Sequence, residues 1–192
     1  MDKKRIAALA LLFVLLAVLV VLFFLGGRDR PILQDPILNP VDEGEDQGSP
    51  RETRTIVLFF LSENDRLLHP EEREINTQEE TVLEAKQTLE ELVRGPREGA
   101  LSPIPAGTRL REVYITREGI AYVDFSRELK DNHPSGSTAE AVTVFAIVNS
   151  LTANFKSIKR VFILIEGSER ETLNGHIDLT RPLLPRLDLV AN

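Results

Sequence analysis

The stretch that decides the fold is Leu110–Phe125, which reads LREVYITREGIAYVDF. Apolar residues alternate with polar ones on both sides of its centre, a pattern typical of two half-buried strands. A two-residue loop would put the two apolar sets on opposite faces of the hairpin. A three-residue loop at 117–119 instead pairs Val113 with Val123, and it puts glycine where the turn needs a positive φ. The sequence therefore predicts a hairpin with a three-residue loop.

Two helices are predicted on either side of this hairpin. Thr77–Glu80 has the spacing of a capping box, apolar residues follow at helical intervals, and Gly95–Pro96 ends the pattern. Ser137–Glu140 repeats the capping spacing at the start of a second helix, whose apolar residues extend to Phe155. Because these apolar residues occupy more than one face, we expect the second helix to be deeply buried.

Two continuous apolar runs, Thr55–Leu61 and Val161–Ile165, have the β-branched and aromatic composition of central strands. Short edge pieces interrupted by Pro70 are expected after the first run. Asn174–Gly175 indicates a tight hairpin turn within residues 171–179. The order of these elements predicts an α+β fold with a mixed β-sheet and two helices on one face.

The N-terminal part of the chain has a different composition. The 192 residues carry a net charge of −7, yet residues 1–30 hold five basic and two acidic side chains. Ile6–Leu25 is an unbroken run of 20 apolar residues. As a helix it would be about 30 Å long, which is the thickness of one hydrocarbon core. The run is longer than the core of a signal peptide and lacks a small-residue cleavage site, so it predicts a retained transmembrane anchor.

The sequence divides into five segments. Residues 26–53 are rich in Gly, Pro and acidic side chains and have no useful apolar periodicity, which predicts a disordered tether. The predicted order is a cytoplasmic N-terminus at 1–5, a transmembrane helix at 6–25, the tether at 26–53, a globular domain at 54–182 and a tail at 183–192. The basic residues before the apolar run favour a cytoplasmic N-terminus. We therefore expect a single-pass protein of the cytoplasmic membrane whose soluble domain is extracytoplasmic.

The composition excludes several classes of function. The chain has no cysteine, which excludes a disulfide scaffold, a thiolate metal site and a cysteine nucleophile. The acidic net charge argues against a nucleic-acid partner. The sequence contains no phosphate-binding glycine loop, no HExxH and no G-x-S-x-G motif. We therefore predict no cofactor, no metal, no catalytic residues and no enzymatic activity.

A few residues remain as candidates for chemistry. His176 and Asp178 fall on one face of a predicted strand, where they could bind a ligand or a divalent ion, or the histidine could simply bond a carboxylate. Asp124, Ser126 and His176 could be combined into a triad, but Ser126 directly follows a strand, where serine more often caps a turn. Asp124 is expected to face solvent or a turn amide. His176 and Asp178 thus support an alternative function as a small-ligand or cell-wall glycan binder or hydrolase.

A stronger signal is that the strands are apolar on both faces, whereas two helices can cover one face of a sheet. Either the chain's own segments at 101–105 or 183–185 cover the second face, or a partner or second copy does. On the predicted hairpin, two tyrosines lie opposite each other on this second face. The candidate interaction face comprises Ile56, Leu58, Phe60, Tyr114 and Tyr122.

An ordered series of short motifs resembles the GerMN domain, which is named for sporulation and spore-germination proteins. The motifs are Leu92–Pro96, Ile104–Thr108, Tyr122–Ser126, Ile147–Thr152, Ile163–Gly167 and Thr172–Leu179. They fall within residues 54–182, so the resemblance covers most of the part beyond the tether.

The resemblance implies a bacterial envelope protein with an α/β module similar to the ring-building domains of secretion-type assemblies, which act by protein–protein contact. It implies no catalytic residues. Sporulation members of the family often have a lipid-anchoring cysteine and tandem copies, whereas this chain has an apolar segment and one copy. We therefore expect a membrane-anchored scaffolding module whose partner is another envelope protein or a second copy of this chain.

Overall fold

The computed structural model describes residues 52–97 and 99–191. The predicted N-terminus at 1–5, the predicted membrane helix at 6–25 and the predicted tether as far as residue 51 lie outside the described residues. Within the described ranges, no helix has both the length and the apolar character that crossing a bilayer requires.

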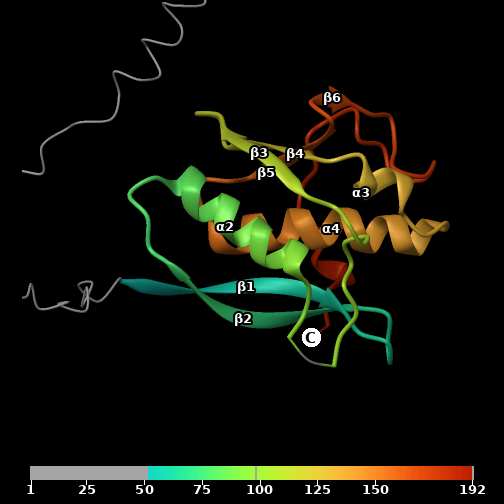
Figure 1. The fold of residues 1–192 in the computed structure, drawn as a ribbon, viewed down its shortest axis with the longest axis horizontal. Coiled ribbons are helices and arrows are strands. Elements are labelled where there is room, and N and C mark those ends of the chain that lie inside the picture. Colours follow the sequence, from blue (N-terminus) through green and yellow to red (C-terminus); the bar gives the residue numbers. More distant parts are fainter. Residues whose placement is uncertain (1–51, 98, 192) are drawn as a thin grey trace, which may run out of the picture. The chain divides into compact units, whose positions relative to one another are not determined.

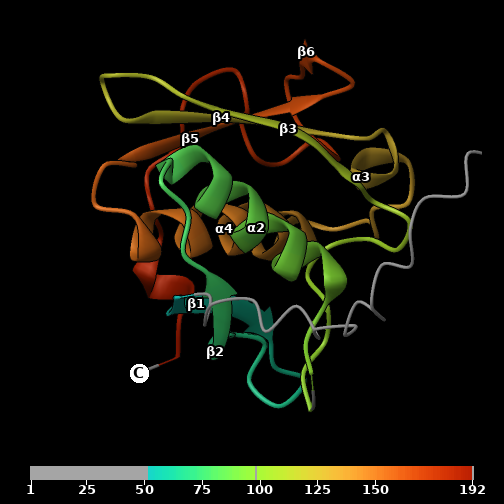
Figure 2. The ribbon, with the colours of Figure 1, turned by 60° about the vertical axis from the view of Figure 1, so that its left-hand side comes forward.

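The described part of the chain forms three layers, with two helices between two β-sheets (Figure 1). One sheet contains β1 (Thr53–Leu61) and β2 (Leu68–Asn76), and the other contains β3 (Leu110–Ile115), β4 (Ile120–Phe125), β5 (Arg160–Ile165) and β6 (Ser168–Glu169). The helices of the middle layer are α2 (Thr81–Arg94) and α4 (Ser137–Asn154). Two short segments complete the fold, α3 (Glu128–Asp131) and the 3-10 helix η1 (Leu187–Leu189). The helices lie between the sheets in the rotated view as well (Figure 2).

The core is centred on the helical layer and on the sheet faces that meet it. Inward residues of the four-stranded sheet such as Val113, Val123 and Ile163 are at most 4% exposed. Every residue of α4 from Val142 to Leu151 is buried. This confirms the expectation of a deeply buried second helix, because α4 contacts β1 on one side, β5 on another and α2 beside it.

The β3–β4 hairpin has the predicted register, with Val113 opposite Val123. Its loop consists of residues 117–119, and Gly119 has a φ of +81°. A Cβ atom at Gly119 would lie 2.6 Å from the carbonyl oxygen of Ser157. Glycine is therefore required here both by the backbone conformation and by the close approach of a neighbouring chain segment.

The fold class is α+β as predicted, but the predicted single sheet is wrong. The four-stranded sheet is indeed mixed, since β4 and β5 are parallel and the other pairs are antiparallel. The run Thr55–Leu61 does not join it. It belongs to β1, which forms a separate sheet with β2 on the other side of the helices (Figure 1). The apolar residues of β1 therefore reflect packing against helices and not a central place in a sheet.

Side chains of α4 satisfy the edge of β1 that does not face β2. The Asn154 Oδ1 atom accepts a hydrogen bond from the Val57 N–H at 2.8 Å, and its Nδ2 donates to the Val57 carbonyl at 2.7 Å. Ser150 Oγ accepts from the Phe59 N–H at 3.2 Å. Because an unpaired strand edge would otherwise leave these backbone groups without partners, α4 takes the place of a third strand.

The expectation of short pieces around Pro70 is also wrong, because β2 runs continuously through this residue. Pro70 lies opposite Phe59, whose N–H points to Ser150 on α4 and not to β2. The Phe59–Pro70 pair therefore forms no backbone hydrogen bond that would require an N–H at residue 70. Proline is tolerated at such a position, on the outer strand of a sheet.

The predicted start of α2 and both predicted capping boxes are wrong, whereas α4 starts at Ser137 as predicted. α2 begins at Thr81 after Glu80, several residues beyond Thr77, and α4 begins after Gly136; neither start has a side-chain capping hydrogen bond. The predicted end of α2 is confirmed, since the helix stops at Arg94 and the following glycine has a φ of +94°. Glu140, the glutamate of the second capping motif, binds the loop at 171–179 instead.

The hairpin predicted at Asn174–Gly175 is absent from the described residues. β5 instead turns back into β6 through Glu166 and Gly167, which have φ values of +54° and +69°. Positive φ at both central residues is the conformation of a type I′ turn. Residues 171–179 form irregular turns that pack against the N-terminal part of α4.

The C-terminal segment connects the layers. Leu183 pairs with Val161 at the edge of β5 through two backbone hydrogen bonds of 3.0 and 2.7 Å. Arg186 N donates to the Asn149 side chain of α4 at 2.9 Å, and Val190 then pairs with Leu68 in β2. The predicted tail at 183–192 thus packs on both sheets as far as residue 191.

Candidate functional site

The outer face of the four-stranded sheet carries a row of aromatic side chains. The pairing of β3, β4 and β5 places Tyr114, Tyr122 and Phe162 side by side on this face. The rings of Tyr122 and Phe162 are 5.2 Å apart and tilted by 30°. Tyr114, at the edge of the row, is 64% exposed, whereas Phe162 is 5% exposed. The helices pack on the opposite face, so no helix covers this outer face, which is open at the Tyr114 end of the row and buried at Phe162.

The structure divides the predicted interaction face into two parts. Tyr114 and Tyr122 lie together on the outer face of the four-stranded sheet, as the register predicts. Ile56, Leu58 and Phe60 lie in the other sheet and are at most 1% exposed. These three cannot belong to an exposed face, because they form the side of β1 that packs into the core. Sequence alternation placed them on one side of a strand but could not show which side the helices cover.

The C-terminal segment extends the open face at the β5 edge. Leu183 pairs with Val161, so its side chain points inward with that of Val161. Leu184 follows it, points outward by alternation, and is 64% exposed. It lies beside Arg160, which pairs with Ile120 on the same outer face. The open face therefore spans β3, β4, β5 and the segment around Leu184.

One end of this face is acidic. A bulge in β3 brings Arg111 to the outer side, where its Nε lies 3.1 Å from Asp124 Oδ2 and its Nη1 pairs with Glu166. The N–H of Gly167 donates to Asp124 Oδ1 at 2.7 Å, so Asp124 does bind a turn amide as predicted. The carboxylates at this end are Glu112, Asp124, Glu166 and Glu169.

The other end of the face is basic. Arg117 lies in the β3–β4 loop, and the Lys159 and Arg160 N–H groups both donate to the carbonyl of Gly119 in that loop. All three basic residues are exposed, together with Glu118. The aromatic row therefore separates a basic end from an acidic end.

His176 bonds a carboxylate, which is one of the alternatives given for it, and the carboxylate belongs to Glu140. Its Nδ1 lies 3.1 Å from Oε2 of Glu140, and Glu140 is fully buried. The backbone N–H groups of Leu173, His176 and Ile177 also donate to this carboxylate, at 2.9, 2.9 and 3.2 Å. Burial would raise the pKa of Glu140, but the hydrogen bonds from the surrounding backbone and from His176 outweigh it, so the pKa is lowered.

The carboxylate of Glu140 therefore holds the loop at 171–179 onto α4. The sequence indicated Glu140 as the last residue of a capping box, and only the tertiary structure directs it to this loop. Asp178 has separate partners, since it accepts hydrogen bonds from Thr180 and pairs with Arg181 at 2.9 Å. The bonds from Thr180 lower the pKa of Asp178. His176 and Asp178 thus do not share a partner.

The residues considered for a triad are not brought together by these contacts. Asp124 is engaged by Arg111 and Gly167. Ser126 is buried and its Oγ accepts a hydrogen bond from the Arg109 N–H at 2.9 Å, which is the turn-capping role expected for it. His176 contacts Glu140.

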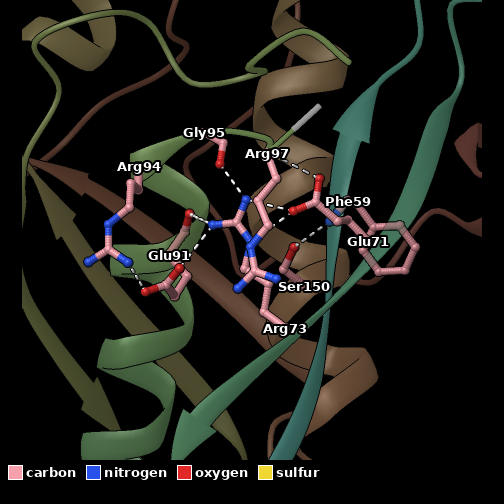
Figure 3. Close-up of polar contacts among 8 residues, drawn as sticks. All are labelled: Phe59, Glu71, Arg73, Glu91, Arg94, Gly95, Arg97 and Ser150. Atoms are coloured by element: carbon pink, nitrogen blue, oxygen red, sulfur yellow. Dashed lines mark hydrogen bonds and ion pairs between the residues drawn. The ribbon is translucent and has the colours of Figure 1, made fainter. Parts of the chain in front are cut away.

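The sequence reasoning missed a buried cation, Arg73, which is 3% exposed. All five of its N–H donors are used, by the carboxylates of Glu71 and Glu91 and by the carbonyl oxygens of Glu91 and Gly95 at the end of α2 (Figure 3). Its guanidinium also lies 5.2 Å from the ring centre of Phe60. The sequence does contain a signal for this burial. Arg73 is two residues before Ile75, whose side chain points inward, and residues two apart in a strand point to the same side. This network fastens β2 to α2 and does not leave donors for a ligand.

Hollows elsewhere on the domain do not include the predicted ligand residues. One of about 560 Å³ lies beside the start of α4 and is lined by Arg66, Ser137 and Val142 among others. Another of about 530 Å³ lies along residues 102–108. Neither is lined by His176 or Asp178.

These features define a small α+β domain in which two helices lie between two sheets and the outer face of the four-stranded sheet has no helix on it. The chain belongs to the Germane family, described as sporulation and spore germination, whose family model matches residues 57–171. The match confirms the resemblance stated from the motifs.

Two solved structures of GerM have a similar fold. The first GerMN domain of the sporulation protein GerM from Bacillus subtilis is 26% identical, with a TM-score of 0.53 over 70% of this chain and 99% of that one. The tandem GerMN domains of GerM are 28% identical, with a TM-score of 0.57 over 71% of this chain and 48% of that one. The chain thus spans about half the length of the tandem protein. A putative lipoprotein from Clostridium perfringens is 21% identical, with a TM-score of 0.49 over 69% of this chain and 87% of that one. No curated protein sequence matched the chain.

Proposed function

We propose that this protein is a membrane-anchored interaction module of the bacterial cell envelope, and that the outer face of the four-stranded sheet is its docking surface. It acts by binding a protein partner and not by catalysis. The observation that carries the proposal is the exposure of Tyr114 in a continuous row with Tyr122 and Phe162. Tyrosine is enriched at protein interfaces because it offers a large apolar ring with a polar end.

A comparison of the buried charges with the aromatic row supports this docking surface. The buried charges Arg73 and Glu140 are saturated by partners within the domain, so they are not available to a substrate. The aromatic row, which is exposed at Tyr114 and buried at Phe162, lies on a sheet face that no helix covers (Figure 1). A surface of this kind is suited to burial against another protein.

The apolar run Ile6–Leu25 is the basis for the proposed membrane attachment. Its length fits one hydrocarbon core, and the basic residues before it favour a cytoplasmic N-terminus. A domain held near the membrane by a tether meets envelope partners at a raised effective concentration.

The docking surface is tested by chemical cross-linking in cells that produce the full chain. The variant Tyr114→Glu with Tyr122→Glu places two charges in the aromatic row and is expected to reduce the cross-linked partner at least about fivefold. The matched control is Leu83→Glu with Leu187→Glu, which places two charges at exposed apolar sites outside this face. Circular dichroism of the purified variants checks that both remain folded. Equal cross-linking yields in the two variants would show that the surface is wrongly assigned.

The location is tested independently of the surface. A reporter enzyme that is active only outside the cytoplasm, fused after Asn192, is expected to be active. A silent reporter on a membrane-bound fusion would reverse the proposed topology.

A further inference from the structure

The two ends of the open face differ in the sign of their excess charge. Along the strands, the end near the β3–β4 loop carries Arg117, Lys159 and Arg160 with Glu118. The opposite end carries Glu112, Asp124, Glu166 and Glu169. Arg111 pairs with Asp124 and Glu166, and Lys86 of α2 lies 3.9 Å from Glu112, so carboxylates remain in excess at this end. The aromatic row crosses all three long strands between these two ends.

This arrangement is informative about what can dock on the face. A partner with a uniformly acidic or basic surface would be repelled at one end, since like charges brought together oppose binding. A partner whose charges are also divided about an apolar centre would be attracted at both ends. A second copy of this chain carries the same two oppositely charged ends about the same aromatic row.

We infer that the open face binds the same face of a second copy, related by a two-fold axis that crosses the strands along the aromatic row. This inference rests on the proposed function and names its partner. The axis turns one copy end over end, so the basic end of each faces the acidic end of the other. A two-fold axis parallel to the strands would instead set acidic against acidic, so the charges select the first arrangement.

The geometry specifies which residues meet. Residues on the axis face their own counterparts, so Tyr114 lies against Tyr114 of the second copy. A residue on one side of the aromatic row faces the residues on the other side of the row in the second copy. Arg160, which lies beside Leu184, therefore faces the region of Leu164 and Glu169 of the second copy. The contact is isologous, and each charge pair therefore occurs twice.

The first test uses the absence of cysteine from the chain. In the full chain in detergent micelles, Tyr114→Cys is expected to form a disulfide-linked dimer on mild oxidation. Leu83→Cys, at a 44% exposed site on α2, is the control and is expected to remain a monomer. A monomer from Tyr114→Cys, or equal dimer from both variants, overturns the inferred arrangement.

The second test uses complementary charge reversals, measured by light scattering of the full chain. Arg160→Glu and Glu169→Arg are each expected to weaken self-association roughly tenfold, because each sets like charges together at both symmetric contacts. Mixing the two variants is expected to restore association, because both contacts of the mixed dimer then join opposite charges. Failure of the mixture to recover overturns the pairing of these ends.

The failure of this inference is distinguishable from that of the proposed function. A photoreactive residue at position 114 in cells reports whichever protein docks there. Adducts of twice the chain mass support the second copy. Adducts with a different protein overturn the second copy but leave the face as a docking surface, and the absence of any adduct overturns both.

Discussion

The two sheets of this domain contain similarly apolar strands, yet they differ in what surrounds them. β1 packs one face on the helices and has its free edge bonded by Ser150 and Asn154 of α4. The β3–β4 hairpin packs its inner face on the same helical layer but keeps Tyr114 64% exposed on the other. The first sheet is closed by contacts within the chain, and the second is open on one side. Apolar composition alone therefore does not indicate a binding surface.

Arg73→Met tests the closed sheet most severely. The change leaves Glu71 and Glu91 beside a buried apolar side chain and removes the donors to the carbonyls at the end of α2. We expect a loss of about 3–5 kcal/mol in the free energy of unfolding, as is typical when one partner of a buried ion network is removed. Urea unfolding measures the loss. As a control, Arg170→Met at an exposed site should change stability by less than about 0.5 kcal/mol.

Glu140→Gln tests the anchor between α4 and the 171–179 loop. The amide group turns a donor toward backbone N–H groups, so we expect a loss of about 2–3 kcal/mol at neutral pH. The pKa of Glu140 is lowered in the folded state, so its contribution is fully present above the ordinary pKa of a glutamate and is lost as the pH falls through the lowered value.

The same reasoning predicts how the two proteins differ with pH. The stability difference between wild type and Glu140→Gln should narrow on acidification below about pH 4.5, where the unfolded carboxyl begins to bind a proton. Unfolding at a series of pH values measures the difference. A gap that stays constant down to low pH would mean that the carboxylate does not hold the loop through its charge.

Asn154→Ala examines the edge of β1. It removes both side-chain hydrogen bonds to Val57 and exposes an edge that α4 otherwise covers, for an expected loss of about 1–2 kcal/mol. Thermal unfolding checks this value. Thr152→Ala, two residues away on the same helix and bonded to the helix itself, is the comparison and should cost less.

Tyr114→Ser should have the smallest effect, below about 0.5 kcal/mol, because the side chain is mostly exposed in the isolated domain. Measured at low protein concentration, its unfolding curve should overlay that of the wild type. A larger loss would mean that the open face is packed against part of the chain itself, and the contrast between the two sheets would then disappear.

The sequence predicted those features that depend on local periodicity. The register of the β3–β4 hairpin follows from the alternation around Val113 and Val123 and from the glycine at 119. The burial of α4 follows from its apolar residues on several faces. The same register places two of the five residues of the predicted interaction face, Tyr114 and Tyr122, opposite each other on the outer face.

The rest of the site could not be predicted, because it depends on partners distant in sequence. Ile56, Leu58 and Phe60 share one side of β1, but alternation is symmetric and does not state which side meets the helices. The Asn174–Gly175 pair has the composition of a hairpin turn, yet the backbone on both sides of it donates to the buried Glu140 and no strand forms there. The bulge that brings Arg111 to Asp124 had no signal in the spacing.

By itself, the sequence determined the family, the hairpin register and the identity of the buried helix, since these follow from residue order and from interactions between near neighbours. The tertiary structure alone decided that two sheets enclose the helices, that Arg73 and Glu140 are buried with all their partners supplied, and that the face around Tyr114 stays open. These three features depend on which surfaces meet when distant segments of the chain pack together. The hydrophobic effect favours burial of apolar area but does not specify which apolar surfaces pack against each other, so the order of residues does not predict them.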